Sequence, residues 1–488
     1  MAGRFETHFL ETIPALALLG RDDEWNFMTD QICISPIDGK EFVRRSVASD
    51  AEIEAAVADA KRAQAEWAEV PIPERAARME QFLKNLLDLN QQIVPELAQQ
   101  MGRPVRYGGE MRGVEERVKH CVATAEASLA DVVPEQKAGF KRFIRRTPLG
   151  TVLVIAPWNY PFLTSVNTIV PALIAGNSVI LKHAAQTILV GERFQQAMDK
   201  VDLPKGLFRN IVLDHDQAGR LIGSGAIDHI NFTGSVAGGR AVERAAAGTF
   251  ASLGLELGGK DPAYVREDAD LEFAIENIVD GAFFNSGQCC CGIERVYVHE
   301  AHYDRFVEGA VELTSKYVLG NPLDDATTLG PMAHKRFADT VRAQTAEAIA
   351  AGAKAHLDPK AFPADEAGTA YLAPQVLTNV DHSMRVMTEE SFGPVIGIMK
   401  VSGDQEALKL MNDSQYGLTA SIWTKDLAAA ESLGEKIETG TVFANRCDYL
   451  DPALAWTGVK DTGRGASLSE IGFHQLTRPK SFHLREHG

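Results

Sequence analysis

The strongest constraint on the fold is an alternation of short apolar runs with helical segments. Thr151–Ile155 (TVLVI) and Asn177–Leu181 (NSVIL) are apolar runs of strand length, and helical sequence follows each of them. Asn210–Leu213 and His229–Phe232 continue the series. Such alternation indicates βαβ units on a parallel sheet that is buried on both faces. Ligands on these sheets bind at the carboxyl ends of the strands.

The flanking sequence extends this α/β pattern. Ser49 to Val70 has apolar residues at helical spacing after a capping residue, and Pro73–Met101 continues the helical character, so the first 130 residues are predicted to be mostly helical. A second α/β region is predicted from Asp261 to Ala455, with strands at Arg295–Val298, Ala373–Leu377, Val395–Met399, Ala420–Trp423 and Thr441–Asn445. Ser481–Leu484 is predicted to be an edge strand that can pair with another subunit.

Composition narrows the class of protein. The net charge of −17 disfavours nucleic acids and anionic membranes as partners. No run reaches 18 apolar residues, and the first 20 residues lack a basic segment, so we expect neither a membrane span nor a signal peptide. The six cysteines are few for 488 residues and three are adjacent, which argues against a disulfide framework and predicts a reducing, cytoplasmic location.

The adjacent cysteines lie in FFNSGQCCCG, Phe283 to Gly292. Three consecutive thiols at a Gly-Gln turn cannot all point into one core, so at least one is expected to face a cleft. A nucleophilic thiol and a buried structural cysteine both fit the pattern. A metal site is disfavoured, because adjacent cysteines chelate poorly and no CxxC pair or nearby histidine completes a tetrahedral set.

Three further motifs follow predicted strands. In LELGGKDP, Glu256 stands between two leucines, where burial raises a carboxyl pKa and suits a general base, although an edge-strand glutamate on a solvated face fits as well. In APWNYP, Asn159 between two prolines is either a rigid oxyanion donor or a turn residue. HINFTGSVAGG, His229 to Gly239, runs from a strand into a helix start that can bind phosphate, but it is not the GxGxxG fingerprint.

Together these motifs resemble the aldehyde dehydrogenase family. Seven motifs occur in the family's order over nearly the whole chain: PWNYP, LKHAAQT, FTGS, LELGGK, FNSGQCC, EESFGPV and GTVFAN. The resemblance implies an α/β fold with a Rossmann-like coenzyme domain (1–126 and 148–257) and an α/β catalytic domain (258–460). A small β bridging element for oligomerisation (127–147 and 470–488) is expected to form homodimers or homotetramers.

The resemblance also implies roles for individual residues. The family's Gly-Gln-x-Cys pattern assigns the nucleophile to Cys290, while Glu256 matches the general base and Asn159 the oxyanion donor. The expected reaction oxidises an aldehyde to a carboxylic acid with NAD or NADP, through a thiohemiacetal and a thioester, without a metal. Matching positions for the cofactor are Ala156, Trp158, Lys182, Ala185, Gly234, Ser235, Gly239, Glu390 and Phe392.

Several positions depart from the family pattern. Ala185 replaces a glutamate that usually accepts the adenosine ribose hydroxyls, which leads us to expect that NADP is tolerated. The stretch NIVLDHDQAGR lacks the expected glycines, so the adenine edge is expected to differ. Thr168 and Ser467 stand where many members carry a basic residue and a glutamate near the general base, which predicts a different proton route from Glu256.

The substrate is predicted from the expected tunnel mouth. Tyr160, Phe284 and Trp456, with Thr164 nearby, favour an apolar, aromatic or cationic aldehyde, although each aromatic could be an ordinary core residue. Asn167 stands where some members for short acidic semialdehydes carry an arginine, which weighs against a small carboxylated aldehyde unless another arginine folds in. The alternatives are such a semialdehyde dehydrogenase, a CoA-acylating enzyme, a structural protein without activity, and a nucleotide-binding module.

Overall fold

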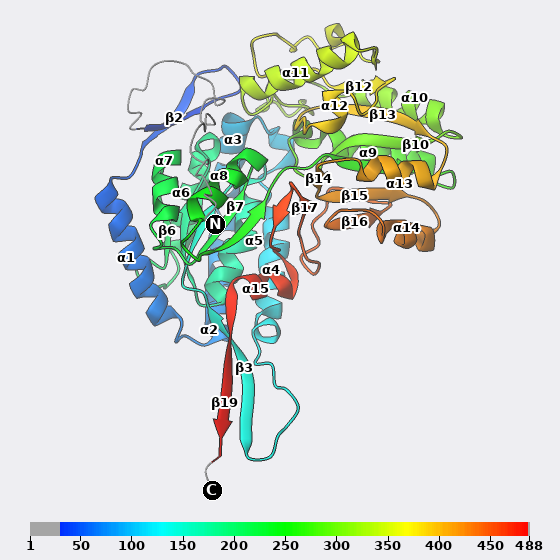
Figure 1. Cartoon of the computed structure of the whole chain (residues 1–488). Helices are drawn as coiled ribbons and strands as arrows, with labels where there is room; N and C mark the ends of the chain where they lie inside the picture. Colours follow the sequence, from blue (N-terminus) through cyan, green and yellow to red (C-terminus); the bar gives the residue numbers. More distant parts are fainter. Residues whose placement is uncertain (1–29, 487–488) are drawn as a thin grey trace, which may run out of the picture.

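The computed structural model describes residues 30–486 and contains two large sheets of mainly parallel strands (Figure 1). The first sheet has the order β18-β8-β7-β4-β5-β6. Its strands are β4 (Thr151–Ile155), β5 (Ser178–Lys182), β6 (Phe208–Asn210), β7 (His229–Thr233), β8 (Ser252–Glu256) and β18 (Gly463–Arg464). β18 is antiparallel to β8, and the other neighbours are parallel. The expected α/β fold with parallel βαβ units is confirmed.

Burial on both faces explains why the strands of this sheet are continuous apolar runs. In β4, Val152 and Val154 pack into one core cluster while Leu153 and Ile155 pack into another. The covering helices are α1 (Asp50–Trp67), α2 (Ile72–Leu87), α3 (Asn90–Met101), α4 (Met111–Ser128), α5 (Pro161–Ile174), α6 (Ile188–Met198), α7 (His215–Gly223) and α8 (Val236–Ala246). The predicted cap of the first helix is present, since Ser49 and Glu52 form a reciprocal capping box.

Two details of this half differ from the sequence prediction. The strand expected at Asn210–Leu213 is wrong in position, because β6 ends at Asn210. The chain then leaves the sheet, and Asp214 and Gln217 form a capping box at the start of α7. A hairpin of β1 (Asp30–Ile34) and β2 (Glu41–Ser46) precedes the helical segment and was not expected.

The second sheet has the order β11-β12-β13-β10-β9-β15-β16. Its strands are β9 (Asp261–Val265), β10 (Ile293–His299), β11 (Lys354–Ala355), β12 (Gln375–Thr378), β13 (Val395–Val401), β15 (Thr419–Trp423) and β16 (Thr441–Ala444). The helices of this half are α9 (Leu271–Phe283), α10 (Tyr303–Thr314), α11 (Lys335–Ala350), α12 (Arg385–Thr388), α13 (Asp404–Asn412) and α14 (Leu427–Gly434). Five of its strands match the predicted runs.

The central strand β9 was missed because its sequence, DPAYV, begins with an aspartate and a proline. Asp261 is buried there, and its carboxylate accepts hydrogen bonds from the backbone N–H and the hydroxyl of Thr419 on the neighbouring β15. Burial raises the pKa of Asp261 well above its usual range. The polar side chain therefore joins two strands of the core.

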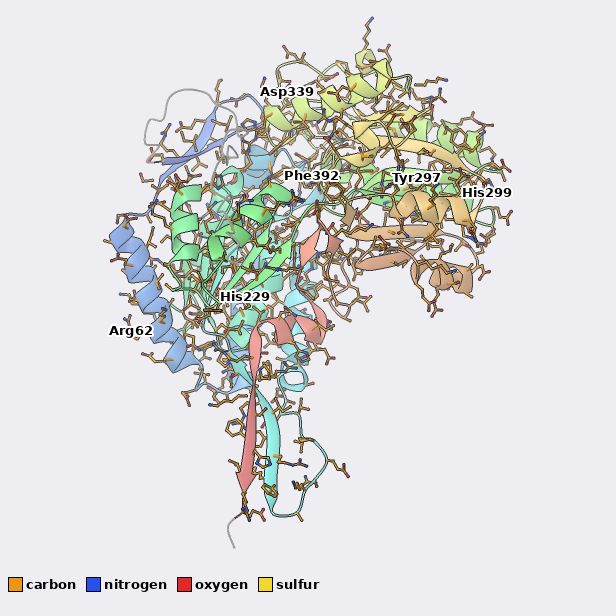
Figure 2. All side chains as sticks on the ribbon, in the orientation of Figure 1. Arg62, His229, Tyr297, His299, Asp339 and Phe392 are labelled. Atoms are coloured by element: carbon orange, nitrogen blue, oxygen red, sulfur yellow. The ribbon has the colours of Figure 1, made fainter. Side chains whose placement is uncertain are left out.

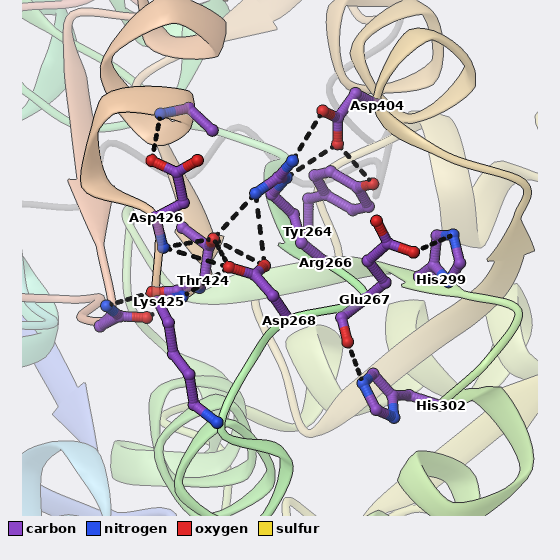
Figure 3. A network of polar contacts seen from close by, with 12 residues as sticks. Tyr264, Arg266, Glu267, Asp268, His299, His302, Asp404, Thr424, Lys425 and Asp426 are labelled. Carbon is purple, nitrogen blue, oxygen red and sulfur yellow. Dashed lines mark hydrogen bonds and ion pairs between the residues drawn. The ribbon is translucent and has the colours of Figure 1, made fainter.

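A polar network joins the far ends of β9 and β15 to α13 (Figure 3). The guanidinium of Arg266 donates from Nε to Asp404 Oδ1 over 2.9 Å and from Nη1 to Thr424 Oγ1 over 2.9 Å. Asp268 accepts hydrogen bonds from the Thr424 hydroxyl and from two backbone N–H groups of the next loop. The network fixes the carboxyl ends of β9 and β15, at the end of the sheet away from the thiol turn.

The C-terminal segment forms a long two-stranded ribbon that projects away from both sheets (Figure 1). β19 (Thr477–Arg485) pairs antiparallel with β3 (Phe140–Pro148) over nine residue pairs, after the short helix α15 (Ser469–Gln475). The rings of Phe143 and Phe482 stack across it, with centroids 4.4 Å apart. The strand expected at Ser481–Leu484 is confirmed, and its partner is β3 of the same chain.

Candidate active site

The thiol turn follows α9 at the end of an irregular segment. Asn285, Ser286 and Gly287 all have positive φ angles, which side chains other than glycine adopt at a cost. A Cβ at Gly287 would lie 2.3 Å from the carbonyl oxygen of Gly393, so only glycine fits there. The backbone of the turn is therefore strained, and the surrounding side chains must hold it in place.

Buried polar side chains supply that support. Asn285 Nδ2 donates to the carbonyls of Asn159 and Gln288 over 3.3 Å each, and its Oδ1 accepts from Arg103 Nε. Gln288 Oε1 accepts from Ala333 N over 2.7 Å. Gln288 of the Gly-Gln motif thus fixes the turn to the segment that leads into α11.

The three cysteines differ in exposure. Cys289 and Cys291 are buried, with sulfurs 3.5 Å apart, and Cys290 is partly exposed. The thiols titrate as a group. Hydrogen bonds from the other two sulfurs lower the pKa of Cys289, and the hydrogen bond to Cys289 raises the pKa of Cys290. Exposure, rather than acidity, distinguishes Cys290 as the sulfur that can reach a substrate.

Asn159 lies beside this turn. Its side chain is 4% exposed and donates from Nδ2 to the carbonyl of Gln288 over 3.3 Å, two residues before Cys290. Its own carbonyl accepts from Arg103 Nη2 over 2.6 Å. Arg103 also pairs with Glu110, whose other oxygen accepts from the first N–H groups of α5 at Phe162 and Leu163. The amide is therefore held rigidly at a helix start.

Glu256 ends β8, where its backbone carbonyl accepts from Gly234 N. Ser467 Oγ donates to Glu256 Oε1 over 2.6 Å, and Thr233 Oγ1 reaches Oε2 at 3.5 Å. Burial raises the pKa of Glu256, while the hydrogen bond from Ser467 opposes the rise. Ser467 was expected to lie near Glu256, and this contact agrees with that expectation.

The two glycines after Glu256 permit close approach of other groups. A Cβ at Gly258 would lie 2.3 Å from Glu390 Oε2, and one at Gly259 would lie 2.7 Å from the carbonyl oxygen of Cys290. Gly259 N donates to Glu390 Oε1 over 3.0 Å, and burial raises the pKa of Glu390 to about 8. The glycine pair therefore brings the EESFGPV loop against the thiol turn.

A buried ion pair holds that loop. Lys260 Nζ lies 2.5 Å from Glu294 Oε2 and donates to Ser391 Oγ over 3.0 Å. Glu294 also accepts from the backbone N–H groups of Ser391 and Phe392, over 2.8 Å each. Neither charged residue was singled out from the sequence, because GGKDP and GIERV contain no recognisable signal for an ion pair 34 residues apart.

Seven of the nine predicted cofactor residues lie at or just after the carboxyl ends of β4, β5 and β7, as the rule for such sheets requires, and Glu390 and Phe392 lie in the loop before β13 of the other sheet. The rings of Trp158 and Phe392 meet edge to face at 5.4 Å, although they come from different halves of the chain. Figure 2 shows Phe392 at the junction of the two halves. Ala156 follows β4 and is buried, and Ala185 begins a 3-10 turn after β5.

The arrangement fits a dinucleotide. Ser235 caps α8 by accepting from Gly238 N, so the free N–H groups of an 11-residue helix face outward near Gly234. A Cβ at Gly239 would lie 2.6 Å from Leu257, so only glycine lets this helix start pack so closely on the strand end. Lys182 is 6% exposed and has no carboxylate within 4.0 Å among residues 30–486. Burial lowers its pKa to about 8, which suits a site that a ligand's phosphate or hydroxyls complete.

The predicted substrate residues divide into two groups. Tyr160 and Trp456 pack with the thiols, Leu418, Leu450 and Leu468 in one apolar cluster. Phe284 instead packs against Tyr107, with centroids 4.8 Å apart, and Thr164 donates its hydroxyl to the Tyr160 carbonyl. Tyr160 and Trp456 are thus beside Cys290, whereas the contacts of Phe284 and Thr164 do not place them there.

Arg117 on α4 is a charged neighbour of the site that sequence reasoning missed. It is buried, and Nη1 donates to the Leu163 carbonyl over 2.7 Å and to Asn167 Oδ1 over 3.1 Å. Its positive charge opposes the rise in the Glu256 pKa that burial causes. An arginine does therefore fold in beside Asn167, from a helix whose sequence gives no sign of this.

The described part of the chain contains neither a metal-binding cluster nor a membrane-spanning helix. Across residues 30–486, no group of three or more His, Cys, Asp or Glu side chains is arranged to hold a metal ion. No helix in the same part of the chain is both long enough and apolar enough to cross a membrane.

Comparisons with known proteins agree with the motifs. Residues 27–482 match the model of the aldehyde dehydrogenase family. The chain is 30% identical to 3,6-anhydro-alpha-L-galactose dehydrogenase of Vibrio sp. (strain EJY3), covering 95% of this chain and 98% of the relative. It is 31% identical to succinate semialdehyde dehydrogenase [NAD(P)+] Sad of Escherichia coli (strain K12), covering 92% and 96%.

The solved structures give the same result. The structure of 3,6-anhydro-L-galactose dehydrogenase in complex with NAP superposes with a TM-score of 0.88 at 30% identity, over 93% of this chain and 96% of that one. The match spans both sheets and the thiol turn. The chain belongs to the aldehyde dehydrogenase family.

Proposed function

We propose that the protein oxidises an aldehyde to the carboxylic acid with NAD or NADP, and that Cys290 is the nucleophile. The observation that carries the proposal is that Cys290, alone among the three adjacent cysteines, is partly exposed, in a turn to which the Asn159 amide is also fixed. Glu256 supplies a carboxylate whose pKa is raised by burial, as a general base requires.

The reaction proceeds in two stages on Cys290. Cys290 gives its thiol proton to solvent and its sulfur adds to the carbonyl carbon, forming a thiohemiacetal whose oxyanion accepts hydrogen bonds from the Asn159 amide and the Cys290 backbone N–H. When bound, the nicotinamide cofactor accepts a hydride and so supplies the oxidising power. Glu256 then takes a proton from a water molecule that attacks the thioester. The C–S bond breaks, and the acid leaves.

Lys182, the α8 start at Ser235, Glu390, Trp158 and Phe392 would hold the cofactor. Use of NADP is favoured by the surroundings of Lys182. Burial is the main factor that lowers the pKa of His215, and the positive charges of Lys182 and Arg336 lower it further. Both charges therefore lie near this histidine. With Ala185 in place of a carboxylate, that position does not repel a 2′-phosphate, although the side chains of Asp214 and Asp216 also act on His215 and Asp214 acts on Lys182.

The apolar cluster of Tyr160, Trp456 and leucines around Cys290 favours an apolar or aromatic aldehyde. For a cationic aldehyde, Asp448 is one carboxyl near the thiols, and burial raises its pKa to about 7, so it is only partly charged at neutral pH. A short carboxylated aldehyde is the second candidate, because Arg117 lies beside Asn167. Glu256 disfavours a CoA-acylating reaction, since transfer to a thiol needs no base to activate water.

A panel of aldehydes with both cofactors, read as kcat/KM, tests the proposal. We expect NADP to support turnover within about a hundredfold of NAD. Cys290→Ala should abolish oxidation of every aldehyde, whereas Cys291→Ala should retain it. Activity that survives in Cys290→Ala would refute the mechanism. A preference for succinic semialdehyde over benzaldehyde and hexanal would establish the second candidate.

We further propose that the β3–β19 ribbon joins subunits into a homodimer or homotetramer. A two-stranded ribbon that stands away from the core is marginal by itself in water. Among residues 30–486 no further strand pairs with β19, so its outer edge can take a strand of another subunit, whereas Ile144 on the outer edge of β3 already bonds to Val132. All six cysteines are free thiols, which is consistent with action in the reducing cytoplasm.

A further inference from the structure

A small cavity with polar lining residues lies next to Ser467. It has a volume of about 10 Å³, which is about the space that one water molecule needs. Residues from four elements surround it, namely Asn167 and Thr168 of α5, His229 and Asn231 of β7, Gly254 of β8, and Gln475 of α15. Ser467 lines the cavity and donates to Glu256, so the cavity is one hydrogen bond away from the general base.

Two observations show that the cavity is lined by polar atoms suited to water. Asn167 is 2% exposed, and its Nδ2 has no hydrogen-bond partner although its Oδ1 accepts from Arg117. A Cβ at Gly254 would lie 2.6 Å from Asn231 Oδ1 and 3.7 Å from His229 Nε2, so both atoms face this glycine. A water molecule there finds donors and acceptors on several sides.

His229 connects the cavity with the molecular surface. The ring is buried in the first sheet (Figure 2), and its Nδ1 lies 2.8 Å from the hydroxyl of Ser252, which is exposed. Burial lowers the pKa of His229 to about 4, so the ring is neutral at rest. A neutral imidazole has one donor and one acceptor nitrogen, and it can take a proton at one while releasing the other.

We propose that Ser467, the cavity and His229 form a proton path from Glu256 to the surface at Ser252. The proposal rests on the function proposed above. During thioester hydrolysis Glu256 gains one proton from the attacking water. It returns that proton to Ser467 Oγ, whose own proton passes to water in the cavity and on to His229 Nε2. The Nδ1 proton leaves through Ser252, so one proton enters and one leaves.

The charged groups around the path are compatible with it. Arg117 donates to Asn167 Oδ1, and its positive charge favours the carboxylate form of Glu256. At the outer end, Ser252 Oγ also lies 3.5 Å from the backbone carbonyl of Asp228. The Asp228 side chain itself accepts from Thr151 N over 2.8 Å.

The path can be tested by separating acylation from deacylation. The enzyme is acylated with 4-nitrophenyl acetate, and release of nitrophenolate measures acylation. Loss of the acyl group from the intact protein, followed by mass spectrometry, measures deacylation. We expect His229→Phe to acylate within about twofold of the wild type and to deacylate about tenfold or more slowly. In His229→Gly, which leaves the space of the ring empty, added imidazole should restore part of the lost rate, which it would not do for a misfolded site.

Matched variants keep the test decisive. His356→Phe is the control, because His356 Nε2 also meets a hydroxyl, that of Thr378 at 2.8 Å, but beside the edge strands of the other sheet. Ser467→Thr keeps the hydroxyl and should deacylate faster than Ser467→Ala, so the path stays testable even if His229→Phe does not fold. Wild-type deacylation rates in both His229→Phe and Ser467→Ala would overturn the path. A wild-type enzyme that is not acylated on Cys290 would instead overturn the proposed function.

Discussion

Replacing Glu294 tests how strongly the buried ion pair stabilises the second sheet. The side chains of Lys260 and Glu294 are 0% and 5% exposed, so Glu294→Leu leaves a buried ammonium without its counter-charge. Breaking a buried pair in this way costs about 3–5 kcal/mol. The N–H groups of Ser391 and Phe392 also lose their acceptor, which costs about 1–3 kcal/mol for each group left without a hydrogen bond. Hydrogen bonds to water that enters the site reduce this cost. We expect a loss of about 4–6 kcal/mol in the free energy of unfolding at pH 7.

Urea unfolding at fixed protein concentration, followed by tryptophan fluorescence, measures this loss, since Trp423 is buried in the same sheet. The double variant Lys260→Met with Glu294→Leu should be more stable than Glu294→Leu alone by about 2 kcal/mol or more. If Glu294→Leu unfolds at the wild-type urea concentration, or the double variant gains nothing, the ion pair does not have the role assigned here.

The pH dependence of Glu294→Leu gives a second check on the same reasoning. Burial already lowers the pKa of Lys260, and removal of Glu294 should lower it further. The unfolded chain then binds more protons than the folded one between the folded pKa and the ordinary lysine value. Stability therefore rises with pH in that window. The deficit should be smaller at pH 9 than at pH 7, and an equal deficit would contradict a buried charge as its cause.

Three further outcomes are expected. Gly258→Ala should raise the KM for the cofactor about tenfold or more with little change in stability, because its methyl group would displace Glu390; an unchanged KM would contradict this. The deacylation rate should fall as the pH drops through a pKa above 4.5, since burial raises the pKa of Glu256 and only the carboxylate accepts the proton. Glu256→Gln should lose that dependence along with most of the rate. Deletion of 477–488 should give monomers by light scattering if the ribbon joins subunits, and an unchanged assembly would exclude it.

Local pattern was enough to predict much of the fold. Strands such as β4 are apolar on both faces and bounded by turns, so their sequence alone identifies them. β9 was missed because Asp261 is polar and is accommodated only by its long-range partner Thr419. The end of β6 was misplaced because the capping box at Asp214 competes with the strand.

The candidate site shows the same division. Cys290, Glu256 and Asn159 lie in motifs with a fixed order and spacing, so they could be named before the structure was known. The supporting groups could not, because each acts through a distant contact. Arg117 meets Asn167 from 50 residues away, and Glu294 meets Phe392 from 98 residues away. Neither hydrophobic periodicity nor a local motif predicts such long-range pairs.

During synthesis of the protein, β3 is made long before its pairing partner β19. Their paired residues are separated by more than 300 positions, from Pro148 to Thr477. At roughly 5–20 residues per second, a ribosome needs roughly 15–65 s to make the intervening chain. During that time the edge of β3 that β19 will cover stays open, while the parallel strands β4 to β8 of the first sheet are being made. The nascent protein should therefore depend on a holding chaperone most in this interval, and a slower ribosome should increase its aggregation.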